Sequence, residues 1–266
     1  MNQPILRVKN VFKSFHVGSM DVSVLKGVSF DVNEKDFLVL FGSSGCGKST
    51  LLHTILGLEA PTSGHISFMG RSLYEGMTDD ELCDFRKRHI GMVYQQPNWI
   101  RSLSVVENVA FPLALLGEDK RVASEHALQA LRLVGMLEWT SYAPMDLSSG
   151  QQQRVALARA IVTDPDVIIA DEPTGNLDYE SGQELMELLR SLNEKADKTV
   201  IMVTHDLEYL GFAKTAIRMF DGTIMSSYDE DSREELISKL RTKSGQMEER
   251  VSVVKNRRVT SETERT

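Results

Sequence analysis

The sequence has little cysteine and no long apolar run, and each shortage excludes a class of protein. Its 266 residues contain only Cys46 and Cys83, and two thiols so far apart are not the disulfide framework of a small secreted domain. No apolar run approaches the roughly 18 to 20 residues of a membrane-spanning helix. The first residues, MNQPILRVKN, also lack the basic and apolar regions of a signal peptide. We therefore expect a cytoplasmic chain, and any work at a membrane would need a membrane partner.

Basic charge and metal-binding clusters are also scarce. The chain has 30 Lys and Arg residues against 38 Asp and Glu residues, a net charge of -8. Domains that bind nucleic acid usually have a basic face, so we expect no nucleic-acid partner. Five of the histidines, His16, His53, His65, His89 and His126, do not cluster as metal ligands do.

Apolar patterning predicts an α/β fold. Residues 5–32 contain short stretches with alternating apolar positions, which are typical of an antiparallel sheet. Residues 37–41, 167–170 and 200–203 are instead continuous apolar runs, as expected for parallel strands buried on both faces. Small or acidic residues and then helical periodicity follow each run. The pattern predicts a doubly wound core with a parallel sheet and an N-terminal antiparallel β subdomain.

Two further regions differ from this core. From about residue 99 to 150 the apolar spacing is helical and no strand is evident, which predicts an inserted helical subdomain. Residues 226–266 are mostly charged, with one helical stretch, REELISKLRTK. Low hydrophobicity predicts that this extension is partly disordered or docks on a partner. We therefore expect one main domain over residues 1–225, followed by a charged extension.

The first chemical motif is GSSGCGKST, residues 42–50, which joins the apolar run FLVLF to a helical pattern. It matches the phosphate-binding loop in the strand-before, helix-after context that the loop requires. Its glycines let backbone N–H groups point at phosphate oxygens, and the helix adds its positive N-terminal end. We expect Lys48 to reach the β and γ phosphates and Ser49 to bind Mg²⁺. The loop residues expected to hold nucleotide are Gly42, Ser43, Ser44, Gly45, Cys46, Gly47, Lys48, Ser49 and Thr50.

A pair of acids ends a second apolar run. VIIADEPTGNLD, residues 167–178, places Asp171 and Glu172 together at the end of an expected strand. Asp171 suits a water-mediated contact with Mg²⁺, and Glu172 suits polarising the water that attacks a phosphate. Adjacent acids at a strand end also occur as helix caps or solvated charges. The phosphate loop upstream favours the catalytic interpretation.

The stretch LSSGQQQR, residues 147–154, resembles the signature LSGGQ of ABC transporter ATP-binding subunits. Residues 5 to about 225 are similar to that family, whose motifs occur here in order. The resemblance implies a P-loop NTPase (RecA-like) core in a head-to-tail dimer, in which one subunit's signature binds the γ phosphate held by the other. The signature positions are Ser148, Ser149, Gly150 and Gln151. Ser149 replaces the family's first glycine, and either Ser148 or Ser149 is also expected to cap the following helix.

The resemblance gives roles to two further polar residues near the reaction. Gln95, in VYQQPN, aligns with the glutamine that contacts Mg²⁺ and senses the attacking water, and Gln96 is the alternative one residue later. His205, in IMVTHD, aligns with the histidine that contacts the γ phosphate and helps to hold Glu172 and water. A lone histidine after a strand is more often structural, but its place after the other motifs favours catalysis.

Two more positions concern the dimer and the base. Asp178, in GNLD, aligns with the residue that crosses the dimer interface. Phe15, in NVFKSF, stands where the family has the aromatic residue that stacks on adenine, since stacking needs only a π face. A core position for Phe15, or His16 in the same role, is the alternative. Cys46 is interpreted as a tolerated small residue and Cys83 as a packing residue.

The implied function is ATP hydrolysis coupled to transport, with ATP and Mg²⁺ as cofactors and an integral membrane permease as partner. Trp99 and Ile100 follow Gln95 where the family contacts that partner, although packing is as good an explanation. ADEPTGNLD and ENVAFPL are similar to the lipoprotein-release, macrolide-export and FtsE-like branch, which performs mechanical work across an envelope. The alternatives are a soluble ABC ATPase acting on nucleic acid or ribosomes, and a regulatory module that binds ATP but hydrolyses it weakly.

Overall fold

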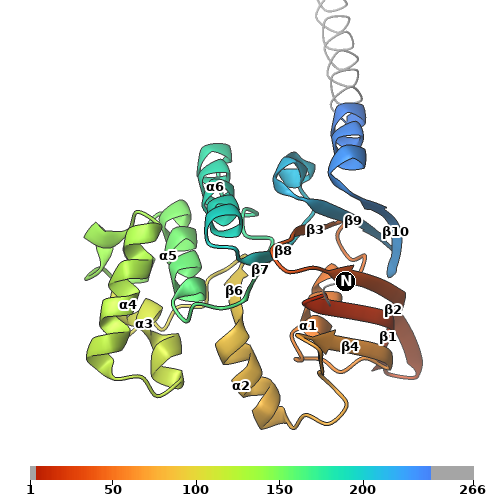
Figure 1. Ribbon diagram of the computed structural model, residues 1–266, viewed down its shortest axis with the longest axis horizontal. Helices are drawn as coiled ribbons and strands as arrows, with labels where there is room; N and C mark the ends of the chain where they lie inside the picture. The colour runs from red at the N-terminus through yellow and green to blue at the C-terminus, as the bar shows by residue number, and fades with distance from the viewer. Residues whose placement is uncertain (1–3, 241–266) are drawn as a thin grey trace, which may run out of the picture.

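A computed structural model describes residues 4–240 of the chain, and its strands form two sheets within that range (Figure 1). One is an antiparallel sheet of four strands in the order β2-β1-β4-β5. The other has six strands in the order β10-β9-β3-β8-β7-β6. The strands of the first sheet are β1 (Leu6–Val17), β2 (Met20–Val32), β4 (Ser63–Phe68) and β5 (Arg71–Ser72). Those of the second are β3 (Phe37–Phe41), β6 (Ile90–Tyr94), β7 (Val167–Asp171), β8 (Thr199–Thr204), β9 (Thr215–Phe220) and β10 (Thr223–Tyr228).

The larger sheet is parallel from β9 to β6, and β10 pairs with β9 in the antiparallel sense. Helices connect its strands. They are α1 (Lys48–Ile55), α2 (Asp79–His89), α3 (Val105–Leu115), α4 (Lys120–Leu133), α5 (Ser149–Ile161) and α6 (Tyr179–Lys195), with short 3-10 helices η1 (Leu137–Trp139), η2 (Pro144–Asp146) and η3 (Leu207–Phe212). The predicted α/β class with an N-terminal antiparallel sheet is therefore confirmed.

The continuous apolar runs are buried on both faces of the larger sheet. In β3, Phe37, Val39 and Phe41 pack into one hydrophobic cluster with residues of α3, α4, α5 and α6. Leu38 and Leu40 point the other way, into a second cluster with residues of α1 and α2. Successive strand residues face opposite sides, so an all-apolar run fits a strand covered twice. The helices α1 and α5 consequently lie on opposite faces of this sheet.

Three strands of the larger sheet, β6, β9 and β10, were not among the expected runs. The strand β6, with the sequence IGMVY, contains Gly91, where a Cβ atom would lie 2.2 Å from the Ala160 carbonyl oxygen. The strand β9, with the sequence TAIRMF, is interrupted by a polar arginine. Glycine at a close backbone contact and arginine in a short run both weaken the apolar signal.

The helices α3 and α4 lie within residues 99–150, where the sequence predicts a helical subdomain, and Figure 1 shows them at one end of the molecule. After β10, residues 230–240 are helical. Leu236, Ile237 and Leu240 of this helix pack against the chain's own core. The described start of the charged extension is therefore attached to the ATPase domain, and residues 241–266 lie outside the described range. None of the helices within residues 4–240 has the length and apolarity needed to cross a membrane.

Candidate functional site

The phosphate-binding loop connects β3 to α1, as the sequence predicts. Gly47 is the residue before α1 and has a φ of 102°, in the left-handed region that glycine adopts without strain. Gly42 lies so close to the next strand that a Cβ atom would be 2.3 Å from the Met219 carbonyl oxygen. The loop therefore needs glycine at 47 for its backbone conformation and at 42 for its fit against β9.

Lys48 is the first residue of α1, and its side chain is only 5% exposed. Its ammonium group donates to the carbonyl oxygens of Gly42 (2.8 Å) and Ser43 (3.2 Å). The Nζ atom also lies 4.0 Å from Glu172 Oε1. A buried ammonium held at the loop and beside a carboxylate is placed where a cation can act on a bound anion.

The acid pair ends β7, one strand away from β8. The backbone of Glu172 has a φ of 46°, and its N–H donates to the Val203 carbonyl of β8 (2.8 Å). Its Oε2 atom lies 2.8 Å from Nδ1 of His205, which follows β8. Burial raises the pKa of the Asp171 carboxyl, and the neighbouring charge of Glu172 raises it further. The structure thus brings Lys48, Glu172 and His205 into one cluster, although their catalytic roles stay predictions.

Gln95 follows β6 and meets the loop after Glu172. A Cβ atom added to Gly175 would lie 2.6 Å from Gln95 Nε2, so a larger residue at position 175 would displace this amide. The Asn176 side chain donates to the Gln95 carbonyl at 3.4 Å. Gln96, the alternative, lines a cavity of about 460 Å³ together with Gln95, so both remain candidates by position.

Asp178 ends the same loop as the N-cap of α6. Its carboxylate accepts hydrogen bonds from the Ser181 backbone N–H (3.0 Å) and hydroxyl (2.9 Å). These hydrogen bonds lower the pKa of the exposed Asp178 carboxyl. The capping role is visible in this chain, while the contact across a dimer interface stays a prediction.

The signature forms the N-terminal end of α5. Ser148 is the N-cap, and its hydroxyl accepts from the Gln151 N–H while the Gln151 side chain accepts from the Ser148 N–H, a capping box. A Cβ atom at Gly150 would lie 2.8 Å from Ser181 Oγ, whereas Ser149 is exposed. The predicted serine cap is confirmed at Ser148, and the exposed Ser149 replaces a family glycine without a clash.

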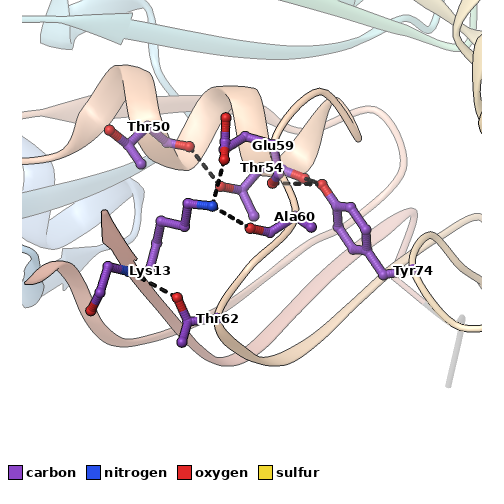
Figure 2. Close-up of polar contacts among 8 residues, drawn as sticks. Lys13, Thr50, Thr54, Glu59, Ala60, Thr62 and Tyr74 are labelled. Carbon is purple, nitrogen blue, oxygen red and sulfur yellow. Dashed lines mark hydrogen bonds and ion pairs between the residues drawn. The ribbon is translucent and has the colours of Figure 1, made fainter. Parts of the chain in front are cut away.

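Phe15 of β1 is half-buried, and one face of its ring is covered by the ammonium of Lys13, 4.8 Å from the ring centroid. Lys13 also contacts Glu59 Oε1 (2.5 Å) and donates to the Ala60 carbonyl (2.7 Å). Figure 2 shows this ammonium between the strand and the loop after α1. The Tyr74 hydroxyl, in the same view, donates towards the carbonyls of Thr54 (2.6 Å) and Glu59 (3.0 Å).

This arrangement holds Phe15 from one side, so the phenyl face available for stacking is the other one. His16, the rival, is exposed and its Nδ1 lies 2.8 Å from Asp21 Oδ1. Sequence reasoning missed Lys13. The only available signal was its position two residues before the aromatic, which places both side chains on one face of the strand.

The two cysteines differ in their surroundings. Cys46, within the phosphate loop, is buried, which agrees with a small residue that the loop tolerates. Cys83 lies on α2 and is exposed, so the expectation that it packs in the core is wrong. The buried apolar residues of α2 are Leu82 and Phe85, and residue 83 faces away from them.

The phosphate loop and the signature do not come together within one chain. The phosphate loop follows β3, whereas α5 packs against the sheet at its β6 edge, with β8 and β7 between. Three strand spacings of about 4.8 Å separate β3 from β6, roughly 14 Å. Because α1 and α5 also lie on opposite faces of the sheet, Ser148 is remote from the loop of its own chain.

Comparison with known proteins identifies the family. Residues 25–175 match the family described as "ABC transporter". An uncharacterised ABC transporter ATP-binding protein of Methanocaldococcus jannaschii is 40% identical over 221 residues, covering 83% of this chain and 98% of the relative. A Thermotoga maritima protein with the same description is 41% identical over 220 residues, covering 83% and 93%.

Solved structures agree with the sequence matches. The dimeric post-hydrolysis structure of the ATP-binding cassette MJ0796, bound to ADP and Pi, has a TM-score of 0.79 and 36% identity over 84% of this chain and 98% of that one. The structure of cbiO1 from Clostridium perfringens, part of the complex cbiONQ, has a TM-score of 0.79 and 27% identity over 91% and 93%. The phosphate loop, acid pair and signature thus occur on a matching fold, and the chain belongs to the ABC transporter family as an ATP-binding subunit that hydrolyses ATP to power transport.

Proposed function

We propose that two copies of the chain assemble head to tail, with two ATP molecules between them. The observation that carries the proposal is the separation of the phosphate loop from Ser148, which lies across the sheet and on its other face. The N-terminal end of α5 has exposed Ser148 and Ser149 and a positive helix end suited to an anion. A second copy can bring this end to a phosphate that the first copy holds.

The residues proposed for Mg²⁺ fit that ion. Ser49, Gln95 and Asp171 all offer oxygen atoms, the donors that Mg²⁺ prefers. Burial, and then the neighbouring charge of Glu172, raises the pKa of the Asp171 carboxyl, and a cation bound beside it would offset both effects. Mg²⁺ bound with ATP would neutralise charge on the phosphates. The protein oxygens would orient it.

In the proposed reaction, the chain's own groups position and stabilise the phosphoryl group. Backbone N–H groups of the loop and Lys48 bind the β and γ phosphates, and Glu172 accepts a hydrogen bond from the attacking water. His205, hydrogen-bonded to Glu172, holds that carboxylate in place. The signature of the second copy completes the charge stabilisation, so ATP closes the dimer and hydrolysis lets it open.

We propose that this motion acts on an integral membrane permease, which places the chain at the inner face of the cell membrane. The cavity of about 460 Å³ beside the signature gives a docking place and is lined by Gln95, Gln96, Pro97, Trp99, Arg101 and Met145, among others. Phe111, Leu115 and Met145 are exposed apolar residues of the nearby helical region. The motif ADEPTGNLD and the stretch ENVAFPL support the lipoprotein-release, macrolide-export and FtsE-like branch.

The partner is tested by purifying the tagged chain from detergent-solubilised cells of its source and identifying what accompanies it. We expect an integral membrane protein at a fixed ratio to the chain. Replacement of Met145 by Asp, which puts a charge beside the cavity, should release that protein while ATP hydrolysis by the isolated chain persists. Recovery of ribosomes or nucleic acid in place of a membrane protein would support the soluble ATPase alternative and contradict this proposal.

A further inference from the structure

One glutamine of α5 is buried where three parts of the proposed site meet. The side chain of Gln153 is 2% exposed. Its amide nitrogen donates to the carbonyl oxygens of Tyr94 (3.0 Å), Gln95 (3.2 Å) and Pro173 (2.8 Å). Tyr94 ends β6, Pro173 directly follows Glu172, and α5 itself begins with the signature. A single amide group therefore joins the segments that carry Gln95, Glu172 and Ser148.

The chemistry of this position requires a hydrogen-bond donor. Three carbonyl oxygens surround the nitrogen, so an acceptor such as a carboxylate would face oxygen atoms on every side. Among residues 4–240, Gln153 Oε1 has no hydrogen-bond partner although it is buried. An unpaired buried carbonyl destabilises a fold, because it gives up its hydrogen bond to water and gains none in return. The Gln153 side chain therefore makes hydrogen bonds through its nitrogen alone. This points to the three contacts of that nitrogen as the reason for a buried glutamine here.

Other α5 residues hold the next part of the segment that follows Gln95. The Trp99 indole N–H donates to Gln152 Oε1 (2.9 Å), and the Arg159 guanidinium stacks 4.5 Å from the Trp99 ring centroid. Arg159 also donates to the Asn98 carbonyl (2.8 Å). Residues 94–99 are thus attached to α5 along their length, and Gln153 makes the contact nearest to the Gln95 side chain.

We infer that Gln153 is a positioning residue for ATP hydrolysis, which fixes the peptide groups of Gln95 and Pro173, and with Pro173 the adjacent Glu172, relative to the signature helix. The inference rests on the proposed roles of Gln95 and Glu172. When the signature helix shifts, Gln153 moves both peptides with it. Without its amide, nucleotide still binds at the phosphate loop, but Gln95 and Glu172 lose their alignment with the phosphoryl group.

The chain supplies a matched control in Asn193 of α6. Asn193 is also 2% exposed, and its amide nitrogen also donates to three carbonyl oxygens, those of Lys35 (3.1 Å), Asp36 (3.2 Å) and Lys198 (2.7 Å). These carbonyls belong to turns at the start of β3 and β8, the opposite ends of those strands from Lys48 and His205. Asn193→Leu therefore removes the same kind of contact away from the reaction.

The test measures ATP affinity and kcat of the full chain with Gln153→Met and Asn193→Leu. We expect Gln153→Met to lower kcat about 10- to 100-fold, as small misplacements of catalytic groups do, with ATP affinity within about twofold. The two variants should lower the unfolding temperature by similar amounts, but Asn193→Leu should leave kcat within about twofold of wild type. Unchanged kcat in Gln153→Met, or an equal loss in Asn193→Leu, overturns the inference.

A double variant tests whether Gln153 acts through Gln95. Gln153→Met should lower kcat by a smaller factor in a Gln95→Ala background than in the wild type, because the residue it positions is already absent. Equal factors in both backgrounds overturn the inference. If Gln153→Met does not fold, Gln153→Asn, whose amide is one methylene group too short, replaces it under the same expectations.

Two single variants separate this inference from the proposed function. Gln95→Ala and Glu172→Gln should each lower kcat strongly if the proposed roles are correct. If both retain wild-type kcat, the proposed function fails. If both lose activity and Gln153→Met does not, only the positioning role of Gln153 fails.

Discussion

His205 and Glu172 are joined by a hydrogen bond of 2.8 Å between the imidazole Nδ1 and the carboxylate Oε2, although 33 residues separate them in the sequence. The other carboxylate oxygen of Glu172 lies 4.0 Å from the Lys48 ammonium. Glu172 is thus held between a side chain that follows β8 and the first residue of α1. This arrangement is the centre of the proposed reaction.

Replacing His205 by Ala should lower kcat while ATP affinity stays close to wild type, because the imidazole holds the catalytic carboxylate and does not hold the bulk of the nucleotide. We expect a loss of about 100-fold or more, the usual size for one group that stabilises a transition state. Steady-state ATPase assays and nucleotide titration separate the two effects. His126→Ala, at an exposed histidine, should behave as wild type. A His205→Ala chain with full kcat contradicts the assigned role.

Replacing Lys13 by Met should weaken ATP binding and leave kcat nearly unchanged, because Lys13 orders Phe15 and does not reach the phosphates. An ammonium over an aromatic face contributes about 0.5–1 kcal/mol, so the expected loss of affinity is roughly two- to fivefold. The readout is the dissociation constant for ATP and the one for GTP. The preference for ATP over GTP should become smaller. Lys9→Met, at an exposed lysine of the same strand, is the control. A loss confined to kcat would disagree with a role at the base.

Gly150→Ala should lower the free energy of unfolding more than Ser149→Ala does. The new Cβ would lie 2.8 Å from Ser181 Oγ, whose hydroxyl donates to Asp178. Overpacking of this kind costs about 1–3 kcal/mol of unfolding free energy. Ser149→Ala, on the exposed side of α5, should cost under about 0.5 kcal/mol. Urea unfolding measures both, and Ser181→Gly should restore the stability of Gly150→Ala. Equal stabilities of the two single variants would contradict the packing argument.

Stability should depend on pH through Asp36, whose carboxylate accepts a hydrogen bond from the Thr215 hydroxyl at 3.0 Å. Burial raises the pKa of Asp36 above 3.8, and the Thr215 hydrogen bond opposes that rise. A carboxyl group whose pKa is raised in the folded state contributes its full stabilisation at pH values below its unfolded-state pKa. This contribution is lost as the pH rises through the folded-state pKa.

Asp36→Asn cannot titrate and keeps an oxygen for Thr215. Its unfolding free energy relative to wild type should therefore rise as pH increases from about 4 to 7. Urea unfolding at a series of pH values measures this difference. Thr215→Val, which removes the hydrogen bond, should lose the most stability near neutral pH. A difference between Asp36→Asn and wild type that does not change with pH would show that Asp36 is not desolvated in solution.

The sequence predicts the parts of the site whose chemistry is local. A phosphate loop needs glycine and lysine within nine residues, so GSSGCGKST is identifiable from spacing alone. The sequence also narrows the cap of the signature helix to Ser148 or Ser149, and the structure selects Ser148. Glu172 is identifiable because it belongs to the acid pair that follows an apolar run, whereas His205 takes its role from the family resemblance. The family resemblance supplied the roles of Gln95, Asp178 and Phe15.

The missed features depend on contacts between distant segments. Lys13 meets Glu59 across 46 residues, and Gln153 meets Tyr94 across 59. Gln152 and Gln153 are the same residue type side by side, but only the helix orientation shows that one is buried among carbonyl oxygens. No local pattern could distinguish them. The strand β6 is missed for a similar reason. Its Gly91 weakens the apolar pattern, and the close contact with Ala160 that explains this glycine is visible only in the structure.

The most direct measurement is sedimentation of a Glu172→Gln chain with and without ATP and Mg²⁺. Glutamine keeps the shape of the side chain but cannot act as the carboxylate that polarises water, so the ATP-bound assembly should persist. We predict a monomer without nucleotide, a dimer with two bound ATP molecules when it is added, and no dimer when Lys48→Ala is combined with Glu172→Gln. A Glu172→Gln chain that binds ATP and stays monomeric at every concentration would contradict the claim that ATP is held between two copies.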